Sequence, residues 1–232
     1  MTPLALTLRR CCVPGRCGNT GKKQQGSKIQ IASDKALSCI LWEKEGGLNS
    51  LGEVLDLPLQ PYTRYYYQIT VRSDVGEQAK SDIHFFETAK LSEPWQAKWI
   101  GVQGDDTHPE FFKAFALRKD VQSARLYICG LGIFEATING QKAGNDLLAP
   151  FINDYEEHYQ YCTYDVTNLL KERNEISVLL GDGWYRGHFG LGEPTHYDRP
   201  LALIAELRIV YSDGSVETIC TDESWQYRRS FT

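Results

Sequence analysis

Short apolar runs rich in β-branched and aromatic residues recur along the chain, with turn residues between them. The clearest series spans residues 124–140, where Gly130, Gly132 and an Asn139-Gly140 pair interrupt strand-like runs. Both central residues of a type I′ hairpin turn need a positive φ, which Asn and Gly adopt at the least cost. We therefore predict a β-meander in this stretch, with a hairpin that turns at Asn139-Gly140.

The second half of the chain continues the same pattern at the spacing of a large antiparallel sandwich. Its strand-like segments are FFKAFAL, ARLYICGL, FEATING, CTYDVTNLL, EISVLLGDG, LALIAELRIVY and VETICTDESW. Only VTNLLKERN has a brief helical pattern, with Thr167 as the candidate N-cap. Since the sequence has no long helix and no Walker or dinucleotide fingerprint, folds with nucleotide sites are disfavoured. The pattern predicts a jelly roll.

The first half also reads as a series of strands, at LALTLRR, IQIA, SCILW, VLDLP, RYYYQITVR and HFFET. Tyr65, Tyr67 and Ile69 alternate with polar positions, so neighbouring tyrosines should point to opposite faces of the sheet. We therefore interpret them as core and sheet-surface residues, in preference to a sugar-stacking strip. The segment LPLQPYTRY resembles the tyrosine corner of fibronectin type III domains, in which the Tyr hydroxyl bonds to nearby backbone.

The segment AKLSEPWQAKWIG has the character of a linker that leads into a new strand. We place a domain boundary here, with residues 1–92 as a fibronectin type III-like sandwich and residues 93–232 as a jelly-roll β-sandwich. The predicted fold class is therefore all-β. Trp95 and Trp99 could form a carbohydrate platform, but tryptophans at such a junction more often become buried between two β domains, and we favour burial.

Composition and charge exclude several classes of protein. The 232 residues carry a formal net charge of −5, which lacks the basic excess that binding to nucleic acid requires. No run approaches the roughly 18 apolar residues of a membrane span, and the N-terminus has no secretory leader pattern. The seven cysteines are an odd number and show no zinc-site spacing. We expect reduced thiols and a soluble cytoplasmic protein.

Several motifs together resemble the bacterial α-L-rhamnosidases of glycoside hydrolase family 78. They are W-x-A-x-W-I at 95–100, ARLYICGLGIFEATINGQKAG, LAPFINDYEEHYQYCTYDVTNLL and LLGDGWYRG. The resemblance is strong over residues 95–225 and weaker before them. It implies a galactose-binding-like jelly roll from a modular hydrolase that releases terminal L-rhamnose by inversion, with its catalytic carboxylates on a C-terminal (α/α)6 barrel. The motifs end before such a barrel begins, so we expect a non-catalytic N-terminal fragment that acts as a scaffold for it.

The resemblance has one local departure. Where relatives carry a Gly-containing LxPG-x-TDY segment, this chain has Ala149 to Tyr155, followed by the acidic Glu156 and Glu157. We therefore expect a different loop shape in this segment. An inverting glycosidase needs two carboxyl groups about 6.5–9.5 Å apart. The acidic candidates lie in loops or turns, where solvation and capping are their usual roles, so we expect no catalytic residue in this chain. They are Asp105, Asp106, Asp154, Glu156, Glu157, Asp182 and Asp198.

The alternative function is a carbohydrate-binding module, since some relatives bind rhamnose with calcium through their jelly roll. Loop residues with hard oxygen ligands or stacking rings are its candidates. The candidate sugar-binding residues are Asp154, Trp184, Tyr185 and Asp198, the candidate calcium ligands are Asn145 and Asp146, and Asn153 is a further loop candidate. In the scaffold interpretation, Phe151, Trp184, Tyr185 and Phe189 would instead contact the barrel.

Several acidic loop residues have a purely structural interpretation. Asp182-Gly183 is a turn pair, Asp154-Tyr155 fits a hydrogen-bonded corner, and Asp165 fits a cap for the VTNLL segment. The Gly-rich stretch 188–200 contains His188 and His196 without a third metal ligand at a suitable spacing, which favours a surface loop.

Overall fold

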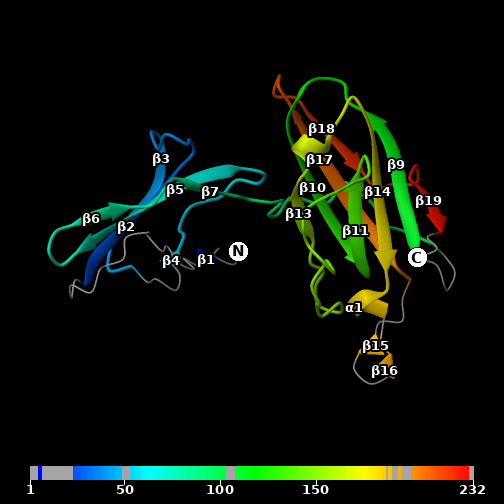
Figure 1. Cartoon of the computed structure of the whole chain (residues 1–232), viewed down its shortest axis with the longest axis horizontal. Coiled ribbons are helices and arrows are strands. Elements are labelled where there is room, and N and C mark those ends of the chain that lie inside the picture. The colour runs from blue at the N-terminus through cyan, green and yellow to red at the C-terminus, as the bar shows by residue number, and fades with distance from the viewer. Residues whose placement is uncertain are drawn as a thin grey trace. The chain divides into compact units, whose positions relative to one another are not determined.

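The structure is a computed structural model that describes residues 5–6, 23–48, 53–102, 108–186, 188–189, 193–194 and 200–229. The chain divides into two compact units, unit 1 at residues 1–94 and unit 2 at residues 95–232. Both are built from antiparallel β-sheets (Figure 1), so the all-β prediction is confirmed. In the part of the chain that the structure describes, no helix is long and apolar enough to cross a membrane.

Unit 1 contains a five-stranded sheet in the order β3-β2-β5-β6, with β7 also pairing with β5, and a short ribbon of β1 and β4. The strands are β1 (Ala5–Leu6), β2 (Gln24–Ala32), β3 (Ile40–Gly46), β4 (Glu53–Val54), β5 (Arg64–Ser73), β6 (Gln78–Lys80) and β7 (His84–Glu87). Each predicted strand of the first half corresponds to one of these elements. The predicted VLDLP strand is shorter than expected, because only its first position lies in β4.

The tyrosines of β5 take the positions that their alternation predicts. Tyr65 is only 3% exposed and packs with Ile29, Ile31 and Ile69 in the core of unit 1. Its hydroxyl accepts a hydrogen bond from the Gln60 backbone N–H at 2.8 Å, which confirms the tyrosine corner. Tyr66 points to the other face and packs against Phe85, with ring centroids 6.4 Å apart. The three tyrosines therefore do not form a strip for a sugar.

Unit 2 is a sandwich of two five-stranded sheets, one in the order β13-β10-β17-β18 with β8 on β17, and one in the order β12-β11-β14-β9-β19. Its elements are β8 (Ile100–Gly101), β9 (Pro109–Ala116), β10 (Val121–Leu131), β11 (Ile133–Ile138), β12 (Gln141–Lys142), β13 (Cys162–Asp165), the 3₁₀-helix η1 (Thr167–Leu169), β14 (Arg173–Gly181), α1 (Gly183–Arg186), β15 (His188–Phe189), β16 (Glu193–Pro194), β17 (Ala202–Tyr211), β18 (Val216–Cys220) and β19 (Gln226–Arg229).

The core of unit 2 lies between these sheets. Alternate residues of β10 and β17, such as Leu126 and Leu207, face alternate residues of β14, such as Ile176 and Leu180, and all four are at most 1% exposed. Burial of a side chain of this size contributes roughly 1.5–3 kcal/mol. Each of these strands therefore buries every second side chain, and the sequence shows this period of two as repeated apolar runs.

The chain crosses from one sheet to the other at Gly132. Leu131 ends β10 in the first sheet and Ile133 begins β11 in the second. Gly132 has φ +118°, and a Cβ there would collide with the Gly181 carbonyl oxygen and would lie 2.9 Å from Cδ2 of Leu201. The chain at this crossover thus approaches the Gly181 carbonyl and the Leu201 side chain so closely that only glycine fits.

The Asn139-Gly140 turn joins β11 to β12 as predicted, with φ values of +54° and +75°. The Asn139 side-chain amide donates to the Leu169 carbonyl and to Oδ1 of Asn174, both at 2.9 Å. The Glu175 N–H donates to Oδ1 of Asn139 at 3.1 Å. Asn139 therefore also connects the hairpin to η1 and to the start of β14, which the turn signal alone does not indicate.

The predicted N-cap at Thr167 is wrong, because η1 begins at Thr167 and Val166 occupies the N-cap position. The Thr167 hydroxyl instead accepts a hydrogen bond from the Ala124 N–H at 2.9 Å. Oδ1 of Asp165 accepts the Thr167 N–H at 3.1 Å. The Asp165 carboxylate thus accepts a hydrogen bond from a backbone N–H at the start of η1, which agrees with the role as a cap predicted for it.

A buried carboxylate holds the first residues of unit 2. Glu206 on β17 is 3% exposed, and its Oε1 accepts the backbone N–H groups of Gln96 at 2.5 Å and Ala97 at 3.1 Å. Trp95 packs edge to face on Tyr161 with ring centroids 5.6 Å apart. The segment that we predicted as a linker is therefore fastened to the outer face of the β10-β17 sheet.

The described cysteines are all free thiols, namely Cys39, Cys129, Cys162 and Cys220. Cys129 lies in β10 and is buried, and this burial raises the pKa of its thiol to about 12. The thiol is therefore protonated at neutral pH. Cys129 therefore behaves as a small buried hydrophobe.

Candidate functional site

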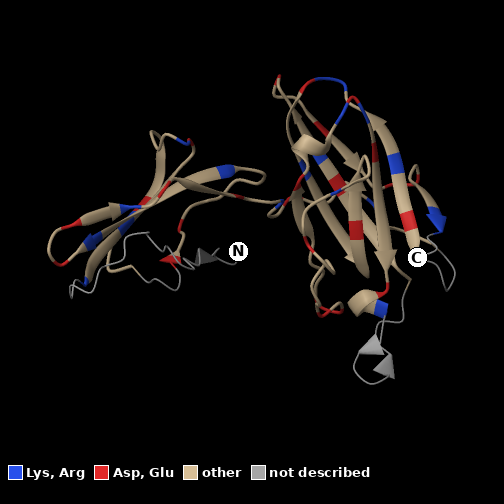
Figure 2. Cartoon of the chain, in the orientation of Figure 1, with Lys and Arg blue, Asp and Glu red and all other residues tan. Residues whose placement is uncertain are grey.

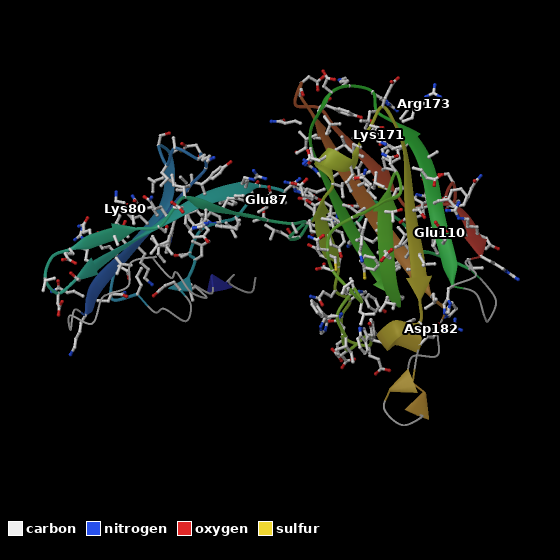
Figure 3. The ribbon with its side chains drawn as sticks, viewed as in Figure 1. Lys80, Glu87, Glu110, Lys171, Arg173 and Asp182 are labelled. Atoms are coloured by element: carbon white, nitrogen blue, oxygen red, sulfur yellow. The ribbon has the colours of Figure 1, made fainter. Side chains whose placement is uncertain are left out.

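Most candidate residues lie at one end of unit 2, where three segments come together. These are the loop between β12 and β13, the turn after β14 with helix α1, and the residues that follow α1 (Figure 1). Figure 3 shows Asp182 at this end, beside α1. Asp198 and His196 lie outside the described residues, as do the side chains of His188 and Phe189.

A pocket of about 430 Å³ opens beside the first of these loops. Strands β11 and β14 and two loop leucines give it a largely apolar lining, and four polar side chains stand around it. The lining residues are His108, Ile133, Phe134, Glu135, Lys142, Asp146, Leu147, Leu148, Leu179, Leu180 and Gly181. Nζ of Lys142 lies 2.9 Å from Oε2 of Glu135. The pocket can therefore offer both apolar contact and paired charges to a small polar ligand.

Asp182 is contacted by a histidine and an arginine at the edge of this region. Its Oδ2 lies 3.4 Å from Nε2 of His108, and its Oδ1 lies 3.5 Å from Nε of Arg186. The Asp182 carbonyl accepts the N–H groups of Tyr185 and Arg186 and so begins α1. Asp182-Gly183 is therefore the start of a single helical turn, and Gly183, with φ +49°, packs directly against Ile133.

Asp146 is tied to the core through Tyr164. Burial raises the pKa of Tyr164, and hydrogen bonds with Cys162 and Asp146 raise it further. Burial likewise raises the pKa of Cys162, which Asp146 also influences. The ring of Tyr164 lies against Gly144, leaving no room for a Cβ at that position. Asp146 therefore lies on a loop whose start is packed on a buried ring.

The expected calcium ligands, Asn145 and Asp146, are neighbours on the exposed part of this loop. Calcium takes about 6–8 oxygen ligands. Within the described ranges, no three His, Cys, Asp or Glu side chains gather as a metal site would require. Asn145 and Asp146 would therefore supply only part of a calcium shell.

Asp154, Trp184 and Tyr185 are the described members of the expected sugar-binding set, and each has structural contacts of its own. Oδ1 of Asp154 accepts the Glu156 N–H at 3.1 Å, and its carbonyl accepts the N–H groups of Glu157 and His158. Asp154 thus shapes its own loop, as the hydrogen-bonded corner interpretation predicted. Trp184 is half-buried and packs against the core.

The position of Tyr185 does not allow the sugar-stacking role predicted for it. It is only 2% exposed, and its ring meets that of Tyr155 at 5.1 Å with an interplanar angle of 72°. A ring that stacks on a sugar must have an open face. Tyr185 is therefore a core residue, because the one-turn helix directs its side chain between the sheets.

The most conspicuous feature of this end is an apolar loop that sequence reasoning identified only at Phe151. Four of its large side chains are between 57% and 78% exposed, namely Leu147, Leu148, Phe151 and Ile152, which we call the apolar loop. Monomeric proteins rarely expose such a contiguous group without a function. In the sequence, this loop is visible only as a group of apolar residues that lacks the alternation of the strand-like segments on either side.

Most of unit 2 matches a known protein family. Residues 119–232 match the model of the alpha-L-rhamnosidase N-terminal domain. These residues are an α-L-rhamnosidase N-terminal domain. The resemblance predicted from the motifs is thereby confirmed.

Curated α-L-rhamnosidases align with much of the chain. One from Alteromonas sp. (strain LOR) is 31% identical over 164 residues, which make up 65% of this chain and 18% of the relative. One from Formosa agariphila is 32% identical over 185 residues, which make up 73% of this chain and 20% of the relative. The chain thus spans about a fifth of the length of these α-L-rhamnosidases.

Solved α-L-rhamnosidase structures share the fold. The enzyme from Aspergillus terreus superposes with a TM-score of 0.77 at 30% identity, over 90% of this chain and 26% of that one. The enzyme from Streptomyces avermitilis, solved with L-rhamnose, gives a TM-score of 0.80 at 19% identity, over 90% of this chain and 38% of that one. The second likeness concerns the fold alone.

Proposed function

We propose that this chain is the non-catalytic N-terminal part of an α-L-rhamnosidase and that unit 2 is a scaffold for the catalytic part. The observation that carries the proposal is the apolar loop, whose Leu147 is 78% exposed and whose Phe151 is 74% exposed. Burial of these side chains against a further domain would stabilise the complete protein. The short share of the relatives' length that the chain covers supports the same conclusion.

The acids near the pocket support a non-catalytic role. A general acid for glycoside hydrolysis needs a carboxyl group with a raised pKa, close to a second carboxylate. Asp182 is instead paired with His108 and Arg186, and Glu135 is paired with Lys142. The hydrolysis of terminal L-rhamnosides is therefore assigned to residues of the complete enzyme outside this chain.

An activity assay combined with a loop variant tests the scaffold. We expect this chain alone to leave an aryl α-L-rhamnoside intact and the complete gene product to hydrolyse it. The double change Leu147→Asp and Phe151→Asp should lower the stability of the complete product by about 3–5 kcal/mol, the burial of two such side chains. The same change should leave the melting temperature of this chain alone nearly unaltered, because both residues are already exposed there.

Val75→Asp is the matched control, since Val75 is 61% exposed at a hairpin turn of unit 1. Hydrolysis by this chain that follows the protein through chromatography would contradict its non-catalytic assignment. Equal stability losses for the loop variant and the control in the complete product would contradict the docking role of the apolar loop.

The second candidate function is a carbohydrate-binding module, favoured by the 430 Å³ pocket with its apolar lining and polar margin. A 6-deoxy sugar such as L-rhamnose combines a methyl group with hydroxyls, which suits Leu147 together with Asp146 and Glu135. Asp154, Trp184 and Asp198 belong to this candidate through the sequence alone. Calcium is likewise part of this candidate through the sequence alone.

Calorimetric titration separates the two candidates. Because the scaffold is the favoured function, we expect no saturable heat that depends on Asp146 at millimolar L-rhamnose, with or without calcium. Saturable heat that disappears in Asp146→Ala would establish the module instead. Dependence of that heat on calcium would assign the ion to the site.

A cytoplasmic location is also part of the proposal. Its support is the set of free cysteines, in particular the buried Cys129 and half-buried Cys162, because a reducing compartment keeps thiols unpaired.

A further inference from the structure

Two exposed aromatic rings meet edge to face on unit 2. Trp99 and Tyr159 have ring centroids 5.8 Å apart and an interplanar angle of 73°. Trp99 is 43% exposed and Tyr159 is 47% exposed. We call this pair the aromatic corner. Its two rings leave a large part of their surface to solvent, although Trp and Tyr side chains are costly to expose.

The backbone at Trp99 is fixed on both sides. The Lys98 N–H donates to the Thr221 carbonyl at 2.8 Å, and the Thr221 hydroxyl donates to the Lys98 carbonyl at 2.7 Å. On the other side, Ile100 pairs with Leu203 in the β8-β17 ladder. Thr221 is fully buried. The Trp99 ring therefore projects from a rigid base, which lowers the entropy lost when a ligand stacks on it.

Tyr159 is supported in a similar way. Two residues along the chain, Tyr161 packs between Trp95, at 5.6 Å, and Tyr127, at 6.3 Å. On the other side, the turn at Asp154 is closed by backbone hydrogen bonds from Glu157 and His158. Both rings thus belong to segments that packing or hydrogen bonds hold in place, and the corner exists before any ligand arrives.

The surroundings of the corner are polar and nearly neutral. Nζ of Lys98 and Oε1 of Glu223 form an ion pair at 2.7 Å, and both side chains are well exposed. His158 and Gln160, on either side of Tyr159, are exposed. Figure 2 shows acidic and basic residues interspersed along the strands and loops of unit 2, with no continuous run of one sign among the described residues. This setting suits a neutral ligand with hydroxyl groups better than an ionic one.

We propose that the aromatic corner is a glycan-binding site that takes a pyranose ring, separate from the 430 Å³ pocket. A pyranose presents C–H groups on its faces and hydroxyls at its edge. The Trp99 face would stack on the C–H groups, and Tyr159 would form the second wall. The adjacent polar side chains would reach the hydroxyls. The choice of a rhamnose-containing glycan as ligand rests on the proposed function, whereas the stacking geometry does not.

Affinity electrophoresis of this chain through gels that contain a soluble rhamnose-containing polysaccharide tests the site. We expect the wild-type chain to be retarded and Trp99→Ala to bind at least tenfold more weakly. Trp99→Phe keeps an aromatic face and should remain within about threefold of wild type. Tyr159→Ala should weaken binding too. Tyr227→Ala is the matched control, because Tyr227 is 54% exposed and contacts another ring, that of Phe111.

Several outcomes would overturn the proposal. The first is that the gel does not retard the wild-type chain. The second is that it retards Trp99→Ala and Tyr159→Ala as strongly as the wild type. The third is that Tyr227→Ala loses as much affinity as Trp99→Ala. Melting temperatures of all variants check that they are folded. If Trp99→Ala does not fold, Tyr159→Ala still tests the site. Asp146→Ala should bind the polysaccharide normally. Because the scaffold is tested by stability and hydrolysis in the complete product, failure of one proposal is distinguishable from failure of the other.

Discussion

Gly132→Ala is expected to lower the free energy of unfolding of unit 2 by roughly 3–5 kcal/mol, from backbone strain of about 1–3 kcal/mol and overpacking of similar size. The residue has φ +118° at the point where the chain changes sheet, and an added Cβ meets the Gly181 carbonyl and Leu201. Neither of these neighbours can move easily, because β14 and the residue before β17 belong to the core. Calorimetric unfolding should show a melting temperature lower by about 10–15 °C for unit 2.

Gly140→Ala is the matched control for this change. Gly140 also has a positive φ, +75°, but an added Cβ there meets nothing within 4 Å. Its cost should therefore be only the backbone strain, about 1 kcal/mol. If both variants lost the same stability, the close contact of Gly132 with Gly181 and Leu201 would have no energetic weight.

Glu206→Ala is expected to cost about 2–4 kcal/mol, because two backbone donors in a poorly hydrated place lose their acceptor. Those donors are the N–H groups of Gln96 and Ala97. The segment that contains them should then detach from the sheet. Trypsin should cleave after Lys98 much faster than in the wild-type chain, and calorimetry measures the loss of stability.

Glu206→Gln is the conservative partner of this variant, since its amide oxygen can still accept both hydrogen bonds. It should keep most of the protection at Lys98 and lose about 1 kcal/mol. Rapid cleavage of the glutamine variant as well would mean that the charge, and not the acceptor, holds the segment. Unchanged cleavage of the alanine variant would mean that Trp95 packing alone suffices.

Much of the fold could be predicted because it depends on short-range patterns. The alternation around Tyr65, the turn at Asn139-Gly140 and the repeated strands of unit 2 each follow from a period of two and from φ preferences. The error at Thr167 arose because a hydroxyl can bond to a distant strand, here at Ala124, instead of its own helix. Such a long-range partner leaves no mark in the local sequence.

The candidate site was harder to predict, because burial of a loop residue depends on tertiary packing. Tyr185 and Trp184 are adjacent in sequence, yet one is in the core and the other is half-buried. The exposure of Leu147 and Leu148 could not be distinguished from burial by composition. The family resemblance, by contrast, rested on ordered motifs and was confirmed.

The pairing of β10 with β17 has a consequence for biosynthesis. Its register joins Leu126 to Leu207, so the central ladder of unit 2 cannot close until residues near 211 have left the ribosome. Every described strand of unit 1 is complete by Glu87. We therefore expect vectorial folding, in which unit 1 is structured while β9 to β14 of unit 2 still wait for their partner. During this interval the apolar faces of β10 and β14 are the surfaces that a ribosome-associated chaperone would have to cover.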